Sequence, residues 1–319
     1  MHKIKVLYNK KASQESSKSW RKEIELKLFR SKVDFITAES REEFVDKLKI
    51  VSSTNTDAVI CVGGDGTFNT ILQELSRIKI PFLVVPTGTA NDLAHDLGMD
   101  GKIGKAIESV RSGQCKVIDL IKVNDQLMAS NGGIGLVGEV AGMVNRYRDT
   151  VPGFKQAMRL LKSHTYSVMV ASRLFQPFKP VVMKIESDGF EGEISSGLLL
   201  VNNQPCIGGH FVIAPDTQNS DGHFNVTIFT HNSRISIAAA ILRVLRGLPL
   251  DHDPGIITFE TSELKVKASS PLRFFGDGEL LTEDKNIRFS LLPKAIKIFQ
   301  PFCSQTNYAK PIAAMEQLI

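Results

Sequence analysis

Ala58-Val-Ile-Cys-Val-Gly-Gly-Asp-Gly-Thr-Phe-Asn69 decides the fold of the first part of this chain, and Phe82-Leu-Val-Val-Pro-Thr-Gly-Thr-Ala-Asn-Asp92 repeats its pattern. In each stretch, an apolar run typical of a buried parallel strand leads directly into a glycine-containing turn. The first turn opens a helical pattern over 67–77, whose apolar residues share one face. A strand, a glycine turn and a helix start direct backbone N–H groups at one place, so both stretches predict phosphate sites.

An ordinary strand-to-helix turn also uses glycine, and a single such turn would not separate the two interpretations. The presence of two turns, each with a Thr and an Asp or Asn beside its glycines, favours phosphate binding. No Gly-Lys-Ser/Thr sequence completes a P-loop, and no GxGxxG fingerprint follows the first strand. A P-loop enzyme and a dinucleotide-binding Rossmann domain are therefore not expected.

The first 122 residues alternate between strand and helix patterns, which indicates a doubly wound α/β domain with ligands at the carboxyl ends of its strands. Strands are expected at 3–8, 33–37, 58–62 and 82–85, and helices near 17–30, 40–52, 67–77 and 101–112.

After Asp119 the pattern changes to short apolar segments separated by Gly, Pro, Asn and Asp, which indicates an antiparallel β-sandwich. Its strands are expected at 116–123, 166–172, 180–187, 196–202, 210–214, 223–229, 256–260, 263–268, 272–275 and 287–291. A helix is expected at 233–248 and a second at 154–163. The 233–248 helix either packs on the sandwich core or lies in a membrane interface, because its apolar run carries interspersed Arg residues.

The composition is that of a globular protein, with 42% hydrophobic and 23% charged residues among 319. The four cysteines lie far apart, without metal-ligand or disulfide-framework spacing, and no signal-peptide pattern is seen, so a reducing cytoplasm is expected. No uncharged apolar run of about 18 residues predicts a membrane span. The net charge of +5, with basic stretches at 21–32 and 146–162, is either plain surface charge or an attraction to anionic phospholipid. Nucleic acid is not an expected partner, because basic and aromatic residues do not interleave.

Further motifs follow the two glycine turns: Val6-Leu-Tyr-Asn9 before them, then Asn131-Gly-Gly-Ile-Gly135, Asn203-Gln-Pro-Cys-Ile-Gly-Gly209, Ser220-Asp-Gly222 and Asp277-Gly-Glu279. In this order and spacing they resemble the diacylglycerol kinase catalytic-domain family, specifically the soluble bacterial lipid kinases related to sphingosine and ceramide kinases. GGDG alone is shared with NAD kinases, whereas PTGTAND and the late Asp-Gly-Glu are specific to the lipid kinases. The resemblance covers nearly the whole chain.

The resemblance implies two domains, an α/β nucleotide-binding domain over 1–122 with 296–319 returning to it, and a β-sandwich lipid-substrate domain over 123–295. It implies transfer of the γ-phosphate of ATP, with Mg²⁺, to a lipid hydroxyl, most simply from diacylglycerol to phosphatidic acid. Peripheral contact with an anionic membrane follows from such a substrate, and a homodimer is left open. Two alternatives are a relative altered in catalysis and an NAD kinase.

The nucleotide site is expected along both glycine turns, where phosphate can approach the backbone closely. The residues are Gly63, Gly64, Asp65, Gly66 and Thr67 in the first turn, Gly88 and Thr89 in the second, and, by resemblance, Asn9, Thr37, Asn69 and Asn91. Hydrogen bonding at helix ends is an equal interpretation for Asn69 and Asn91.

Three carboxylates are candidates for the chemistry of phosphoryl transfer. Asp65 lies among the phosphates, where it either binds magnesium, takes a proton or caps the following helix. Asp277 and Glu279 come from a turn that, without the resemblance, reads as a solvated hairpin tip. With it, Glu279 is the leading base for the lipid hydroxyl, Asp65 and Asp277 are magnesium ligands, and Asp65 as the base is the open alternative.

Two further segments bear on the prediction. The stretch 216–223 resembles a structural cation loop with Asp221 and the backbone carbonyls of Gln218 and His223, and an Asp-Gly turn between strands is nearly as good an interpretation. Val137 stands where relatives carry an Asp facing the lipid headgroup. Glu139 is its only nearby acidic substitute, two positions along what is expected to be a strand.

Overall fold

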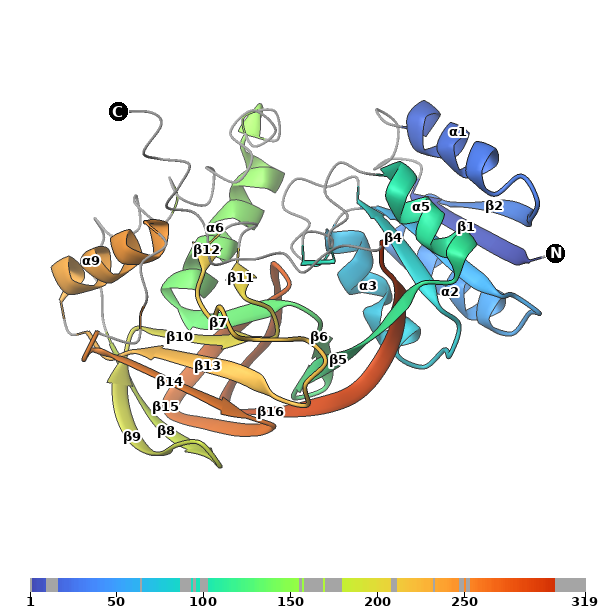
Figure 1. Ribbon diagram of the computed structural model, residues 1–319. Helices are drawn as coiled ribbons and strands as arrows, with labels where there is room; N and C mark the ends of the chain where they lie inside the picture. Colours follow the sequence, from blue (N-terminus) through green and yellow to red (C-terminus); the bar gives the residue numbers. More distant parts are fainter. Residues whose placement is uncertain are drawn as a thin grey trace, which may run out of the picture. The chain divides into compact units, whose positions relative to one another are not determined.

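The computed structural model describes residues 2–9, 17–63, 65–86, 93, 96–97, 103–154, 157, 169, 180–207, 211–231, 233–246, 250 and 253–301. The chain divides into two compact units, whose elements are labelled in Figure 1. Unit 1 contains the described residues within Met1–Asp119 and Pro293–Thr306, and unit 2 contains those within Leu120–Leu292. Two long strands, β5 (Cys115–Val123) and β16 (Glu279–Phe299), run from one unit into the other.

Unit 1 alternates strands and helices, which confirms the predicted α/β class. Its elements are β1 (Lys3–Asn9), α1 (Ser17–Lys27), β2 (Lys32–Ala38), α2 (Arg41–Ser52), β3 (Ala58–Gly63), α3 (Asp65–Leu75), β4 (Phe82–Pro86) and α5 (Ile103–Ser112). The end of β16 joins a parallel sheet in the order β16–β4–β3–β1–β2. α3 begins at Asp65, two residues earlier than its apolar pattern predicts, so Asp65 and Gly66 lie in its first turn.

The central strand of this sheet is buried along its whole length, as its continuous apolar sequence predicts. Val59, Ile60 and Val62 are fully buried, and Phe68, Ile71 and Leu72 of α3 are buried as well. Burial raises the pKa of the Cys61 thiol to about 12, so this cysteine serves as a small core residue.

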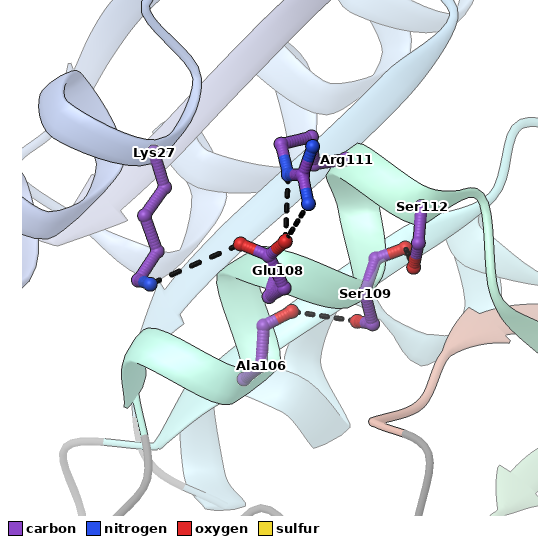
Figure 2. A network of polar contacts seen from close by, with 6 residues as sticks. All are labelled: Lys27, Ala106, Glu108, Ser109, Arg111 and Ser112. Atoms are coloured by element: carbon purple, nitrogen blue, oxygen red, sulfur yellow. Dashed lines mark hydrogen bonds and ion pairs between the residues drawn. The ribbon is translucent and has the colours of Figure 1, made fainter.

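Helices α1 and α5 contact each other, and a small network of charged side chains lies between them (Figure 2). The Glu108 carboxylate accepts a hydrogen bond of 2.6 Å from Arg111 Nε on the same helix, and Lys27 Nζ of α1 lies 3.8 Å from its other oxygen. The Arg111 guanidinium, followed by Lys27, lowers the pKa of Glu108. The network lies at the surface, so it adds little stability to the contact between the two helices.

In its described residues, unit 2 is built from antiparallel strands and two helices, which confirms the predicted β-sandwich. Its elements, besides β5 and β16, are β6 (Gln126–Met128), β7 (Asn131–Gly135), α6 (Leu136–Thr150), β8 (Val181–Ser187), β9 (Glu191–Ser196), β10 (Leu198–Asn202), β11 (Cys206–Ile207), β12 (Phe211–Val212), β13 (Phe224–Phe229), α9 (Arg234–Leu245), β14 (Ile256–Thr261) and β15 (Glu263–Gly276). Its main sheet follows the order β14–β13–β10–β7–β15, with β8 and β16 also paired to β15.

Both faces of this main sheet are buried, and β10 shows it most clearly. Leu199 and Val201 point into a core shared with β8, β15 and β16. Leu198 and Leu200 point to the opposite face, where they pack in a second core with residues of α6 and α9. Figure 1 shows these two helices on the same side of the strands.

The structure corrects several expectations for this unit. β7 was not predicted, because the three glycines of 131–135 give no strand pattern. α6 was not predicted, because its N-cap residue is Gly135 and no side chain caps the helix. The expected strands 263–268 and 272–275 are one strand with a bulge, and β16 is much longer than 287–291. The helix at 233–248 is confirmed by α9. The expected strand 166–172 and helix 154–163 lie outside the described residues, apart from Phe154, Ala157 and Met169. Among the helices described, none has the length and apolar character needed to cross a bilayer.

Candidate functional site

The carboxyl ends of the unit 1 strands bring several predicted nucleotide residues into one line. Asn9 ends β1 opposite Ala38 of β2, and the preceding pair joins Tyr8 to Thr37. On the other side of β1, Tyr8 pairs with Val62, so Asn9 and Gly63 leave the sheet side by side. This edge is where ligands bind in parallel α/β sheets. Three residues far apart in the sequence thus lie on adjacent strands at this edge.

Gly63 ends β3 at a position that leaves no room for a side chain. A Cβ atom added there would lie 2.6 Å from Cβ of Thr67, in the first turn of α3. The close approach holds the start of α3 against the end of β3. The first N–H groups of a helix have no partner within the helix, and a helix start that follows a strand in this way commonly binds phosphate.

Four residues of the predicted nucleotide site, Gly64, Gly88, Thr89 and Asn91, lie outside the described residues. Asp65 and Gly66 are described only as the backbone of the first turn of α3. Asn69 lies half-buried on α3, two residues after Thr67.

In unit 2, the predicted Asp-Gly-Glu turn joins β15 to β16. Asp277 and Gly278 both have positive φ, of 51° and 80°, which suits a tight hairpin turn with an Asp-Gly pair. The Asp277 carboxylate accepts hydrogen bonds from the backbone N–H groups of Ala129 and Ser130, each 2.8 Å long, and from the Ser130 hydroxyl. The Asp277 N–H in turn donates to the carbonyl oxygen of Asn131 at 3.1 Å. The turn is therefore fixed to the start of β7, although Gly278 at its tip is exposed.

The start of β7 is itself fixed to the segment that follows β10. Asn131 is buried, and its Oδ1 atom accepts hydrogen bonds of 3.1 Å from the N–H groups of Asn203 and Gln204. Its Nδ2 atom donates to the Cys206 carbonyl oxygen. The Asn131, Asn203 and Asp277 motifs, which are 72 or more residues apart, thus form one hydrogen-bonded cluster. Sequence reasoning missed Ala129 and Ser130, which contribute mainly backbone N–H groups and so carry no sequence signal.

Glu279 is the first residue of β16 and is half-buried, two positions beyond Asp277. It pairs with Gly276 across the turn, so its position depends on the geometry of that turn. The contacts of Asp277 therefore also place Glu279.

The proposed cation loop of unit 2 has the geometry of a local turn. The Asp221 carboxylate accepts a hydrogen bond of 3.0 Å from the N–H of His223, and the intervening Gly222 has a φ of 88°. Gln218, Asp221 and His223 are exposed. Over the part of the chain that is described, no three His, Cys, Asp or Glu side chains are grouped as metal ligands.

The expected strand around Val137 is wrong, because Leu136 begins α6. Two positions along a helix correspond to a rotation of about 200°, whereas along a strand they share a face. Glu139 is exposed on α6 and does not occupy the direction of residue 137. The side chain of Val137 lies outside the described residues.

Comparisons with known proteins agree with this architecture. Residues 3–123 match the model of the diacylglycerol kinase catalytic domain, and residues 142–300 match that of the YegS C-terminal NAD kinase beta sandwich-like domain. A diacylglycerol kinase of Bacillus subtilis is 31% identical over 232 residues, 70% of this chain and 71% of that protein. A probable lipid kinase YegS of Escherichia coli is 28% identical over 76% of this chain and 78% of its own length. The crystal structure of a putative diacylglycerol kinase from Bacillus anthracis shares the fold, with a TM-score of 0.76 at 20% identity over 94% of this chain and 97% of that one.

Proposed function

This chain belongs to the diacylglycerol kinase catalytic-domain family and is a lipid kinase, and from that premise we propose that it transfers the γ-phosphate of ATP to the hydroxyl of diacylglycerol. The product would be phosphatidic acid. The observation that carries the proposal is the line of Asn9, Thr37 and Gly63 at the carboxyl edge of the unit 1 sheet.

We assign the nucleotide to that edge. The free N–H groups at the start of α3 and the positive end of its dipole would bind the phosphates, as helix N-termini commonly do. Thr67 lies in this first turn and adds a hydroxyl group, and Gly63, by having no side chain, lets the start of α3 lie close against the end of β3.

Glu279 is the proposed base. Its carboxylate would take the proton of the lipid hydroxyl while that oxygen bonds to the γ-phosphorus and the bond from this phosphorus to the β–γ bridging oxygen breaks. ADP leaves with the electron pair of that bond. A fixed turn matters here, because the base must lie within hydrogen-bond reach of the hydroxyl.

The predicted magnesium ligands divide into two roles. A carboxylate has about four lone-pair directions, and the Asp277 carboxylate already accepts three hydrogen bonds from protein donors. We therefore assign Asp277 mainly to holding the turn and Asp65 to Mg²⁺. The ion would neutralise charge on the phosphates. The loop at Gln218, Asp221 and His223 remains a proposed structural cation site.

The test is transfer of labelled γ-phosphate from ATP to a panel of diacylglycerol, monoacylglycerol, sphingosine, ceramide and NAD. We expect diacylglycerol to be labelled most, and Asp65→Asn to abolish the labelling, because an amide neither binds magnesium well nor accepts a proton. Labelling of NAD alone would replace the proposal by an NAD kinase. Binding of ATP without transfer to any acceptor would make the chain a relative that has lost catalysis.

A further inference from the structure

Helix α9 is apolar on both of its sides, although it lies at the surface of unit 2. Its inner side packs against the sheet through Ile237 and Ala240, which are fully buried, and Val244. Its outer side carries Ile235, which is 83% exposed, and Leu242, which is 44% exposed. Ile235 is the most exposed large apolar side chain among the described residues. A surface helix normally turns a polar face to water, so this outer side is suited to a partner.

The exposed residues of α9 and its C-cap form one stripe. Ile235, Ala239, Leu242 and Arg246 are all exposed and follow steps of four, three and four residues. This spacing keeps side chains on the same side of a helix. The solvent side is therefore a continuous apolar strip that ends in a cation.

The charges of the segment narrow the choice of partner. Residues 233–246 contain Arg234, Arg243 and Arg246 and no Asp or Glu. Apolar and basic residues without acidic ones are the composition of a helix that lies in the interface of an anionic bilayer. A second copy of the same face is disfavoured, because a symmetric contact would bring like charges together.

We propose that the outer face of α9, formed by Ile235, Ala239, Leu242 and Arg246, binds the surface of a bilayer that contains anionic phospholipid. Ile235 and Leu242 enter the acyl boundary, and Arg246 meets the lipid phosphates. The role of this binding rests on the proposed function, because it would hold the kinase at the membrane where its lipid substrate lies.

The first test is cosedimentation with mixed phosphatidylcholine–phosphatidylglycerol vesicles, without ATP. Ile235→Gln and Leu242→Gln should each weaken binding by roughly tenfold, the loss expected for one buried aliphatic side chain. Arg246→Gln should weaken it by about fivefold and reduce its salt dependence. The matched control is Ile50→Gln on α2, which removes an equally bulky side chain that is 64% exposed. It should bind vesicles as the wild type does.

The second test separates docking from catalysis. Ile235→Gln should phosphorylate diacylglycerol in detergent micelles at the wild-type rate and diacylglycerol in vesicles more slowly. If the wild type phosphorylated no lipid while Ile235→Gln and Leu242→Gln still lost vesicle binding, the proposed function would be wrong and the docking face would remain supported. Wild-type vesicle binding by Ile235→Gln and Leu242→Gln would overturn the docking face. So would a shift from dimer to monomer in Ile235→Gln with unchanged vesicle binding, since the face would then join two copies of the chain.

Discussion

The carboxylate of Asp277 accepts a hydrogen bond of 2.8 Å from the backbone N–H of Ser130, a residue 147 positions earlier in the chain. The contact ties the β15–β16 turn to the start of β7. Since Glu279 follows two residues later, the same contact determines where the proposed base stands. Asp277, which the family resemblance gives as a magnesium ligand, thus holds the β15–β16 turn in place through its hydrogen bonds.

Asp277→Asn should lower both stability and turnover. The amide has one acceptor oxygen, and its NH₂ group would face an N–H donor, so we expect a loss of about 1–3 kcal/mol in the free energy of unfolding. Turnover should fall with little change in the KM for ATP, because Glu279 would be displaced. Thermal unfolding and steady-state kinetics measure the two effects. Asp284→Asn is the matched control, because Asp284 is an exposed carboxylate on β16 that accepts a hydrogen bond from the nearby N–H of Asn286. Full stability with no turnover would instead indicate that Asp277 acts directly on metal or substrate.

Glu279→Gln should reduce turnover by roughly 10² or more, because the amide keeps the size of the side chain and loses the proton acceptor. ATP binding, measured by calorimetry, should persist. Glu283→Gln serves as the control, since Glu283 is exposed on the same strand and pairs with Arg273 at 2.9 Å. If affinity for ATP fell while turnover stayed the same, Glu279 would be a nucleotide or metal contact.

Gly63→Ala should destabilise unit 1 by about 1–3 kcal/mol, because the new methyl group overlaps Cβ of Thr67 and one of the two residues must move. ATP affinity should fall with it, as the start of α3 shifts away from the strand edge. Gly104→Ala on α5 is the control. The nearest atoms to its methyl group would be the flexible ends of Glu23 and Lys27, at 3.1 Å. This variant should raise the free energy of unfolding by roughly 0.5–1 kcal/mol, as replacing glycine by alanine in a helix does. Unchanged stability and ATP affinity in Gly63→Ala would contradict the packing argument.

Glu186 should contribute stability that depends on pH. Hydrogen bonds from Lys184 and then Lys267 lower the pKa of this carboxyl to about 2, from an ordinary value of 4.5. Because the folded-state pKa is depressed, the stabilisation is present above about pH 4.5 and is lost as the pH falls toward 2. Glu186→Gln should therefore unfold at a slightly lower temperature than the wild type at neutral pH, and the difference should vanish near pH 2.

The difference in unfolding temperature between Glu186→Gln and the wild type should also shrink in high salt, because the ion pairs of Glu186 with Lys184 and Lys267 lie at the surface. Glu263→Gln, which removes an exposed carboxylate from the neighbouring strand β15, is the control and should follow the wild type more closely. A difference for Glu186→Gln that grew on acidification would refute the assigned sign.

Local patterns predicted the elements that have a strong signal of their own. The apolar run 58–62 and the glycines after it were sufficient to place β3 and the start of a helix, and the apolar stretch 233–248 was sufficient for α9. Where the signal was weak, the prediction failed. β7 contains three glycines in five residues, and it is a strand because β10 and β15 pair with it on its two sides.

The sequence by itself determined the strands and helices of unit 1, the helix α9, the glycine turns and the motifs of the family resemblance, because each depends on residues that are close together in the chain. Only the tertiary structure decided that Asp277 is held by Ala129 and Ser130, and that the outer side of α9 stays exposed while its inner side is buried. The physical reason is the same in both cases. A backbone N–H group is identical in nearly every residue, and a helix with two apolar sides does not specify which side faces the sheet, so long-range packing makes the choice.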